Sequence, residues 1–235
     1  MCSANSMVSV IIPTFNEKDS ILLLIDAIHN ELVSYNHEIL VIDDNSPDGT
    51  YQLVSNAGLP FVRPILRTEN RGLANSIRCG LENAAGNIFV VMDSDFNHQP
   101  KYLPFMIQSL SYYDCVTASR FLYGSRMLPR YRQIFSWIFN IFVRIMTRRW
   151  ITDSLYGYFA IKRSVIEKYN YDNIFWGYGD YFIRLLFYLQ RQKVAILQFP
   201  AVNGERKGGK GNSRFLKVFL QYAIETLKLA YKERF

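Results

Sequence analysis

The sequence is poor in cysteine and contains no long uninterrupted apolar run. Cys2, Cys79 and Cys115 lie far apart among 235 residues. This spacing argues against a disulfide framework or a zinc site and suits a reducing cytosol. The most apolar stretches, 102–113 and 133–143, are bounded by charged residues and are shorter than the ~18 apolar residues of a membrane span. The first residues also lack the pattern of a secretory signal. We therefore expect a cytoplasmic chain without membrane spans.

Basic residues are scarce in the first half of the chain and acidic residues in the second. Residues 1–115 carry 6 Lys/Arg against 13 Asp/Glu, a net charge of −7, whereas residues 116–235 carry 21 against 7, a net charge of +14. This split indicates two surfaces for different partners: a cation on the acidic half, and a phosphate or an anionic membrane on the basic half. The acidic first half, and the absence of a known recognition module, argue against binding of nucleic acid.

Short apolar runs alternate with helical patterns through the first half. The expected strands are residues 8–12, 38–42, 61–66 and 88–92, and the expected helices are residues 19–32, 51–56 and 74–85. This alternation predicts an α/β fold with a mostly parallel, doubly wound sheet. Ligands bind beyond the carboxyl ends of such strands. Three of those ends carry the polar segments 13–17, 43–44 and 93–95.

Two carboxylates, Asp93 and Asp95, directly follow the last of these strands. Like charges held this close repel each other unless a cation neutralises them. A hard divalent ion held by one or two carboxylates and substrate phosphates, Mg²⁺ or Mn²⁺, fits this donor set, with Asn97 as a third oxygen ligand. The alternative is a polar turn whose aspartate caps a helix.

Eight segments of the chain form a pattern when they are taken together and in order. In the first half they are VSVIIPTFNE (8–17), ILVIDDNSPDGT (39–50), RTENRGLANSIRCGL (67–81) and VVMDSDFNHQP (91–100). In the second half they are ASRF (118–121), PRYRQIFSWIFN (129–140), DSLYGYFAIKRSVI (153–166) and FWGYGDYFIRLL (175–186). Together these segments resemble the family 2 glycosyltransferases, and among them the dolichyl-phosphate or polyprenyl-phosphate mannose synthase group.

The resemblance implies a GT-A fold, a Rossmann-like sheet flanked by helices, that uses a nucleotide-diphosphate sugar. The positions that match the family's nucleotide-sugar site are Pro13, Phe15, Glu17, Asp44 and Asp93. Asp93 and Asp95 match its metal site, with Asp95 also counted as catalytic, and Asn97 stands where the family usually has Gln. Phe15 stands where the family commonly has Tyr, so base stacking survives but a hydroxyl contact does not.

The basic half carries the residues that match the family's acceptor side. By resemblance, Arg120 and Arg132 bind the phosphate of the acceptor lipid, and Arg206 is carried over as a third phosphate ligand. Residues 134–149 and 215–232 form helical patterns that are apolar over most of their circumference, which one packing face does not require. Either the helix over residues 134–149 is buried nearly all round, or part of it lies against a membrane or a partner. For residues 215–232 the alternatives are an ordinary core-facing helix and a membrane contact.

Two further aspartates of the second half, Asp153 and Asp180, are candidate catalytic residues. A lipid monophosphate acceptor is already largely dianionic at neutral pH and needs little help from a base. Asp180 would then bind the sugar, whereas a hydroxyl acceptor would need one of these carboxylates as general base. The structural alternative for either residue is an ion pair with a neighbouring arginine.

We therefore expect one glycosyltransferase domain over residues 1–235, with a nucleotide-sugar half (1–115) and an acceptor half (116–235) that bears amphipathic membrane-facing helices. The expected reaction is the inverting, metal-dependent transfer of a hexose, foremost mannose from GDP-mannose, to a polyprenyl phosphate at the cytosolic face of a membrane. Some relatives use a membrane-embedded partner subunit, and by analogy this chain would use one as well. The alternatives are UDP-glucose or UDP-N-acetylglucosamine as donor, an acceptor that is not a lipid, and a non-catalytic scaffold subunit.

Overall fold

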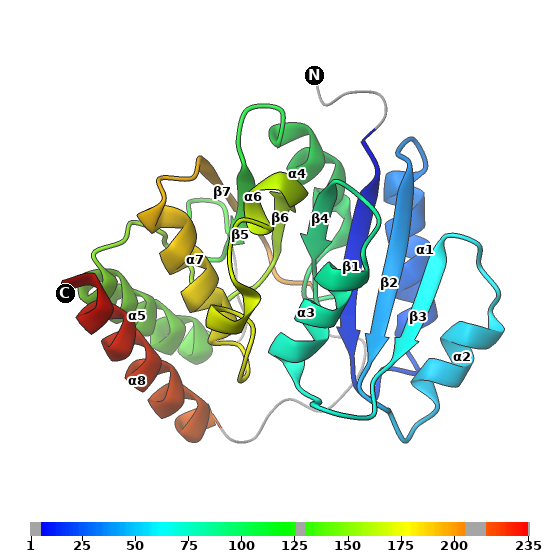
Figure 1. Cartoon of the computed structure of the whole chain (residues 1–235), viewed down its shortest axis with the longest axis horizontal. Coiled ribbons are helices and arrows are strands. Elements are labelled where there is room, and N and C mark those ends of the chain that lie inside the picture. Colours follow the sequence, from blue (N-terminus) through cyan, green and yellow to red (C-terminus); the bar gives the residue numbers. More distant parts are fainter. Residues whose placement is uncertain (1–5, 126–129, 205–214, 235) are drawn as a thin grey trace.

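A computed structural model describes residues 6–125, 130–204 and 215–234. Within these ranges a seven-stranded sheet in the order β3-β2-β1-β4-β6-β5-β7 carries helices on both faces (Figure 1). The strands are β1 (Val8–Thr14), β2 (His37–Asp43), β3 (Val62–Leu66), β4 (Ile88–Val91), β5 (Cys115–Ser119), β6 (Phe159–Lys162) and β7 (Ile196–Pro200). The helices are α1 (Ile21–Leu32), α2 (Thr50–Asn56), α3 (Leu73–Asn83), α4 (Leu103–Ser109), α5 (Arg130–Thr147), α6 (Arg163–Ile166), α7 (Tyr181–Arg191) and α8 (Phe215–Arg234), with 3₁₀ turns at Pro100–Tyr102 and Tyr171–Asn173.

The sheet is mostly parallel, as the alternation of strands and helices predicts. Strand β1 pairs in parallel with β2 and β4, β2 with β3, and β5 with β7, whereas β6 runs antiparallel to its neighbours β4 and β5. The first strand is longer than the expected residues 8–12, because β1 continues through Pro13 to Thr14, opposite Asp43. The Thr14 hydroxyl donates to the Asp43 carboxylate at 3.0 Å. This bond holds the ends of β1 and β2 together at the edge where ligands bind in such sheets.

Both faces of the sheet are buried, which explains why the strands are continuously apolar. Val10 and Ile12 of β1 belong to a core that also contains Ile25 of α1. Ile11, between them, belongs to the core on the other face, with Ile77 of α3. Each strand thus buries alternate side chains against the helices of opposite layers, and its carboxyl end is fixed from both sides.

Helices α5 and α8 lie outside these two layers. They lie side by side at one end of the molecule (Figure 1) and form a third apolar cluster with α7. The inner side of this cluster is formed by Phe139 and Val143 of α5, Phe187 of α7, and Tyr222 and Leu229 of α8. The two helices therefore pack against each other and against α7.

Two polar side chains of α5 point inward. Ser136 and Asn140 are buried, and Asn140 accepts a hydrogen bond from the backbone N–H of Ser154 at 2.6 Å. The large apolar side chains of the same helix are about half exposed or more: Ile134, Phe135, Trp137, Ile138 and Ile145. On α8 the exposed apolar side chains are Leu220, Ile224, Leu227 and Tyr231. For the helix over residues 134–149, the expectation of burial on nearly all sides is therefore wrong.

No helix within the described residues is long and apolar enough to cross a bilayer.

Candidate functional site

A pocket of about 720 Å³ opens at the carboxyl ends of β1, β2 and β4. It is lined by Pro13, Thr14, Phe15, Glu17, Asp44, Arg71, Gly72, Leu73, Ser76, Asp93, Ser94, Asp95, Asn97 and Tyr178. All five positions assigned to nucleotide-sugar binding and all three assigned to metal binding are among these residues. The structure therefore brings together residues that lie up to 84 positions apart, because three parallel strands end at one edge of the sheet.

Asp44 joins the end of β2 to the start of α3. Its carboxylate accepts hydrogen bonds from the Arg67 guanidinium at 2.5 Å, the Ser76 hydroxyl at 2.8 Å and the Gly72 backbone N–H at 2.6 Å. Gly72 has a φ of 131°, a backbone conformation that side chains rarely adopt, and this lets the chain turn into α3 beside Asp44. Asp44 thus shapes one wall of the pocket while its own charge is balanced by Arg67.

Phe15 and Glu17 form the wall contributed by the loop after β1. Glu17 is buried and accepts a hydrogen bond from the Ser20 hydroxyl at 2.9 Å, at the start of α1. Phe15 is 52% exposed, although a large apolar side chain is normally buried. An exposed ring at the mouth of a polar pocket provides a flat surface on which a nucleobase can stack.

The loop after β4 presents two carboxylates to the same pocket. Asp93 is 45% exposed at its side chain, whereas Asp95 is only 6% exposed. Both oxygens of Asp95 accept hydrogen bonds from Asn97, from its backbone N–H at 3.0 Å and from its side-chain amide at 2.8 Å. Asn97 therefore orients the Asp95 carboxylate, and its role as a metal ligand stays a prediction.

These oxygen donors fit a hard divalent cation that takes its remaining ligands from elsewhere. Among the described residues, no three or more His, Cys, Asp or Glu side chains gather as a closed metal cage. Mg²⁺ is commonly bound by one or two carboxylates together with substrate phosphates and water, and Mn²⁺ accepts the same oxygen ligands. Asp93 and Asp95 in an open pocket match that arrangement.

His98 is hydrogen-bonded to the loop that carries Asp93 and Asp95. Its Nδ1 accepts the backbone N–H of Asp93 at 2.8 Å, so its Nε2 carries the proton and donates to the Tyr156 carbonyl at 3.0 Å. The ring stacks on Tyr158 at a centroid distance of 4.7 Å. Burial lowers the pKa of His98 to about 4, so the ring is neutral at physiological pH. The sequence hinted at this residue only through its position near Asp93 and Asp95.

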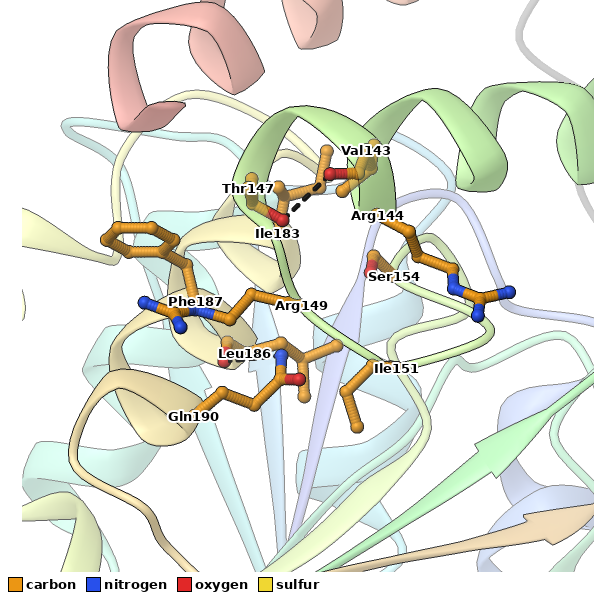
Figure 2. A pocket seen from close by; sticks show the side chains of 10 residues that line it. All are labelled: Val143, Arg144, Thr147, Arg149, Ile151, Ser154, Ile183, Leu186, Phe187 and Gln190. Carbon is orange, nitrogen blue, oxygen red and sulfur yellow. Dashed lines mark hydrogen bonds between the residues drawn. The ribbon is translucent and has the colours of Figure 1, made fainter. Parts of the chain in front are cut away.

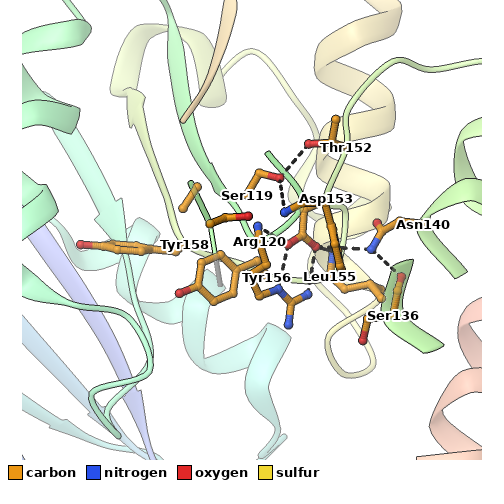
Figure 3. Close-up of polar contacts among 12 residues, drawn as sticks. Ser119, Arg120, Ser136, Asn140, Thr152, Asp153, Leu155, Tyr156 and Tyr158 are labelled. Atoms are coloured by element: carbon orange, nitrogen blue, oxygen red, sulfur yellow. Dashed lines mark hydrogen bonds and ion pairs between the residues drawn. The ribbon is translucent and has the colours of Figure 1, made fainter. Parts of the chain in front are cut away.

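A buried ion pair joins Arg120, just after β5, to Asp153 (Figure 3). Asp153, which has no exposed surface, accepts hydrogen bonds from Arg120 Nε at 2.8 Å and Nη2 at 2.9 Å and from the Arg120 backbone N–H at 3.0 Å. The guanidinium lies 4.8 Å from the ring centroid of Tyr156. Burial alone would lower the pKa of Arg120, but the Asp153 carboxylate outweighs that effect and the net shift is upward.

Asp180 lies in a second buried ion pair, at the start of α7. Its carboxylate accepts hydrogen bonds from Arg184 Nη1 at 2.6 Å and from the Tyr178 backbone N–H at 2.9 Å. Arg184 is itself buried, with its guanidinium 3.7 Å from the ring centroid of Trp176. Asp153 and Asp180 therefore both have the arginine partner of the structural alternative, and neither lines the pocket. A catalytic role for either residue stays a prediction.

Two residues assigned to the acceptor phosphate cannot be placed. The side chain of Arg132 and the whole of Arg206 lie outside the described residues. The structure adds Tyr178 to the site, because this residue lines the pocket from the loop before α7. Sequence reasoning selected Asp180 from the same segment and missed this tyrosine, although an aromatic residue between two glycines was a signal that could have identified it.

The fold and the pocket together define a class of enzymes. A mostly parallel sheet whose strand ends carry an acidic pair beside a stacking surface is the GT-A arrangement of nucleotide-sugar-dependent glycosyltransferases. The chain has this fold in common with the crystal structure of glucosyl-3-phosphoglycerate synthase from Mycobacterium tuberculosis with Mn²⁺, uridine diphosphate and glucosyl-3-phosphoglycerate. The TM-score is 0.72 at 21% identity, over 97% of this chain and 80% of that one.

Residues 9–170 match the model of the glycosyl transferase family 2, and the chain belongs to that family. It is 36% identical over 166 residues to a dolichol-phosphate mannosyltransferase of Pyrococcus furiosus, covering 68% of this chain and 47% of that relative. It is 32% identical over 212 residues to an undecaprenyl-phosphate mannosyltransferase of Micrococcus luteus, covering 86% of both. The chain thus spans about half the length of the first relative and most of the second, and the resemblance seen in the sequence is confirmed.

Proposed function

We propose that this protein transfers mannose from a nucleotide-diphosphate mannose, foremost GDP-mannose, to the phosphate of a polyprenyl lipid. The pocket at the ends of β1, β2 and β4 carries the proposal, because it combines an exposed aromatic ring with two adjacent carboxylates. The names of the Pyrococcus and Micrococcus relatives support the sugar and the acceptor. In this proposal residues 1–115 bind the donor and residues 116–235 the acceptor.

The proposed reaction is a single displacement that inverts the configuration of the anomeric carbon. A phosphate oxygen of the acceptor forms a bond to the anomeric carbon, while the bond from that carbon to the diphosphate breaks and its electron pair leaves with the diphosphate. A divalent cation, Mg²⁺ or Mn²⁺, bound at Asp93 and Asp95 would stabilise the charge that develops on the leaving group. The Mn²⁺ in the Mycobacterium tuberculosis structure supports this choice of cofactor.

The residues of this chain then have distinct tasks. Phe15 stacks on the nucleobase, and Asn97 and His98 hold the acidic loop in place through Asp95 and the Asp93 backbone. Arg120 provides positive charge on the acceptor side, while Asp153 fixes the direction of its guanidinium. No general base is required, since the acceptor phosphate is already ionised at neutral pH.

We further propose that the exposed apolar faces of α5 and α8 contact the surface of a bilayer, foremost at the cytosolic side. Amphipathic helices of this kind bury apolar side chains at the level of the lipid headgroups. Tryptophan at this level, here Trp137 and Trp150, is typical of membrane interfaces. A lipid acceptor reaches the pocket only if the protein lies on the membrane that contains it. A membrane-embedded partner subunit stays a prediction of the family resemblance.

The decisive experiment compares Asp95→Asn with Asp26→Asn, a matched change at an exposed aspartate of α1 outside the pocket. Each protein is incubated with Mn²⁺ or Mg²⁺, a polyprenyl phosphate and labelled GDP-mannose, UDP-glucose or UDP-N-acetylglucosamine, and transfer into the organic phase is measured. We expect transfer from GDP-mannose, lost in Asp95→Asn and retained in Asp26→Asn, with unchanged circular dichroism. Full activity of Asp95→Asn would remove the metal assignment, and label transferred from a UDP-sugar would replace the donor.

A further inference from the structure

A basic groove opens at the carboxyl-terminal end of α5, away from the pocket described above. It has a volume of about 480 Å³ and is lined by Ile141, Arg144, Ile145, Arg148 and Arg149. Arg144 and Arg148 are exposed, and neither side chain forms an ion pair within the residues that the structure describes. The groove thus places uncompensated positive charge directly beside apolar side chains.

A residue in the left-handed backbone conformation follows the last turn of α5. The N–H of Arg149 donates to the carbonyl of Arg144 at 3.2 Å, which closes the last turn, and Arg148 between them has a φ of 52°. Glycine usually occupies this left-handed position, because any other side chain is strained there. An arginine at Arg148 therefore lowers stability relative to glycine, and strain of this kind is typical of residues that serve a function.

Arg149 also lines the groove, but its guanidinium contacts α7. Its guanidinium lies 5.1 Å from the ring centroid of Phe187 on α7, on the side of the helix end opposite to the guanidinium of Arg144 (Figure 2). This contact anchors the turn against the core of the third cluster. Arg144 and Arg148 are the two exposed arginines of the groove.

The groove continues into the exposed apolar face of α5. Ile145 belongs to both, with 63% exposure, and Trp137 and Ile138 follow toward the start of the helix at 51% and 53%. Arg144 also borders a small cavity that Trp137 lines, so charge and apolar surface alternate along the helix. A ligand that fits this surface carries an anionic group next to hydrocarbon.

We propose that this groove binds the phosphate of an anionic lipid headgroup in the bilayer on which α5 and α8 lie. The proposal rests on the membrane contact proposed above and adds a specific anchoring point to it. The alternating charge and apolar surface favour a lipid over a free phosphate ion, which needs no apolar neighbour. The structural alternative is that Arg144 and Arg148 only offset the negative end of the α5 dipole.

The test replaces Arg148 by Gly, alone and with Arg144→Gln, and uses Lys168→Gln as matched control, because Lys168 is exposed after α6 and loses the same charge away from the groove. Binding of the full chain to vesicles of phosphatidylcholine, with and without phosphatidylglycerol, is measured by flotation. Thermal melting is measured with and without inorganic phosphate. Each basic residue near an anionic membrane increases the binding constant about fivefold.

We expect Arg148→Gly to bind phosphatidylglycerol vesicles about fivefold more weakly and the double variant about 25-fold more weakly. Binding to pure phosphatidylcholine should stay unchanged, and Arg148→Gly should melt no lower than wild type because glycine relieves the strain. If Arg144 and Arg148 only offset the helix dipole, the variants should melt at a lower temperature and bind vesicles as wild type does. That result would refute the proposal. An equal loss in Lys168→Gln, or protection by inorganic phosphate that Arg148→Gly removes, also refutes it. If wild type binds neither vesicle, the proposed membrane contact itself is wrong.

Discussion

Replacing Asp180 by Asn separates a structural from a catalytic role for this carboxylate. Asp180 is fully buried and pairs with the buried Arg184 at 2.6 Å. Removing one partner of a buried ion pair destabilises a protein by about 3–5 kcal/mol, because the other charge is left uncompensated. Glu225 lies 3.5 Å from the same guanidinium and keeps part of the compensation, so we expect the lower end, about 3 kcal/mol.

For a protein of this size, that loss lowers the melting temperature by about 6–12 °C. The matched control is Asp172→Asn, because Asp172 pairs with Arg78 at the surface with 69% of its side chain exposed. This surface pair should contribute less than about 1 kcal/mol. Melting of all three proteins is followed by circular dichroism and calorimetry, and transfer of labelled sugar is measured well below the melting transitions.

If Asp180 is structural, the folded Asp180→Asn protein transfers sugar at close to the wild-type rate. Loss of a general base instead lowers turnover by about 100- to 10,000-fold. Wild-type melting combined with a loss of that size would refute the ion-pair reasoning and return Asp180 to the catalytic residues. A loss of both would show that the Tyr178 backbone, which Asp180 holds, transmits the damage to the pocket.

Three further predictions concern other parts of the chain. Burial alone would raise the pKa of Glu38, but the hydrogen bonds that it accepts from Ser9 and Ala85, together with Arg63, outweigh burial and lower this pKa below the usual 4.5. The stability that these contacts contribute is therefore present above pH 4.5 and is lost as the pH falls through the folded-state pKa. Urea unfolding at a series of pH values should show a shallower acid loss in Glu38→Gln, and parallel curves would contradict this. Phe15→Ala should weaken nucleoside diphosphate binding by about 5- to 100-fold in calorimetry, while Phe15→Tyr retains it; equal affinities would exclude base stacking. A Cβ at Gly80 would lie 2.3 Å from the side chain of Ile11, so Gly80→Ala should lower stability by about 1–3 kcal/mol, less so alongside Ile11→Ala. An unchanged melting temperature would show that β1 and α3 can move apart.

The pocket illustrates how far local sequence patterns reach. Each apolar strand and the polar residues that follow it are adjacent in the chain, so Asp44, Asp93 and Asp95 could be assigned to strand ends without knowledge of the fold. A parallel sheet then brings those ends to one edge whatever the detailed packing. The assignment of these residues to one pocket therefore required only the order of strands and helices.

The partners of the buried charges could not be obtained in this way. Asp153 binds Arg120, which lies 33 residues away in the chain. The sequence alone allowed either a catalytic role or an ion pair for Asp153. Asn97 likewise has a polar side chain suited to a metal, yet it donates to Asp95. In each case the choice depends on which side chains approach once the elements have packed.

Helix α5 shows the same division between sequence and structure. Its periodicity alone predicts a helix with a narrow polar stripe and a wide apolar surface, because helical spacing is a local property. The direction that each side faces was decided by the tertiary structure: Asn140 hydrogen-bonds to Ser154 inside the protein, and Trp137 and Ile138 remain outside. Local patterns determine which elements form and where they end. Contacts between residues distant in the chain decide which face is buried and which charges are paired, since these depend on distances that exist only in the folded protein.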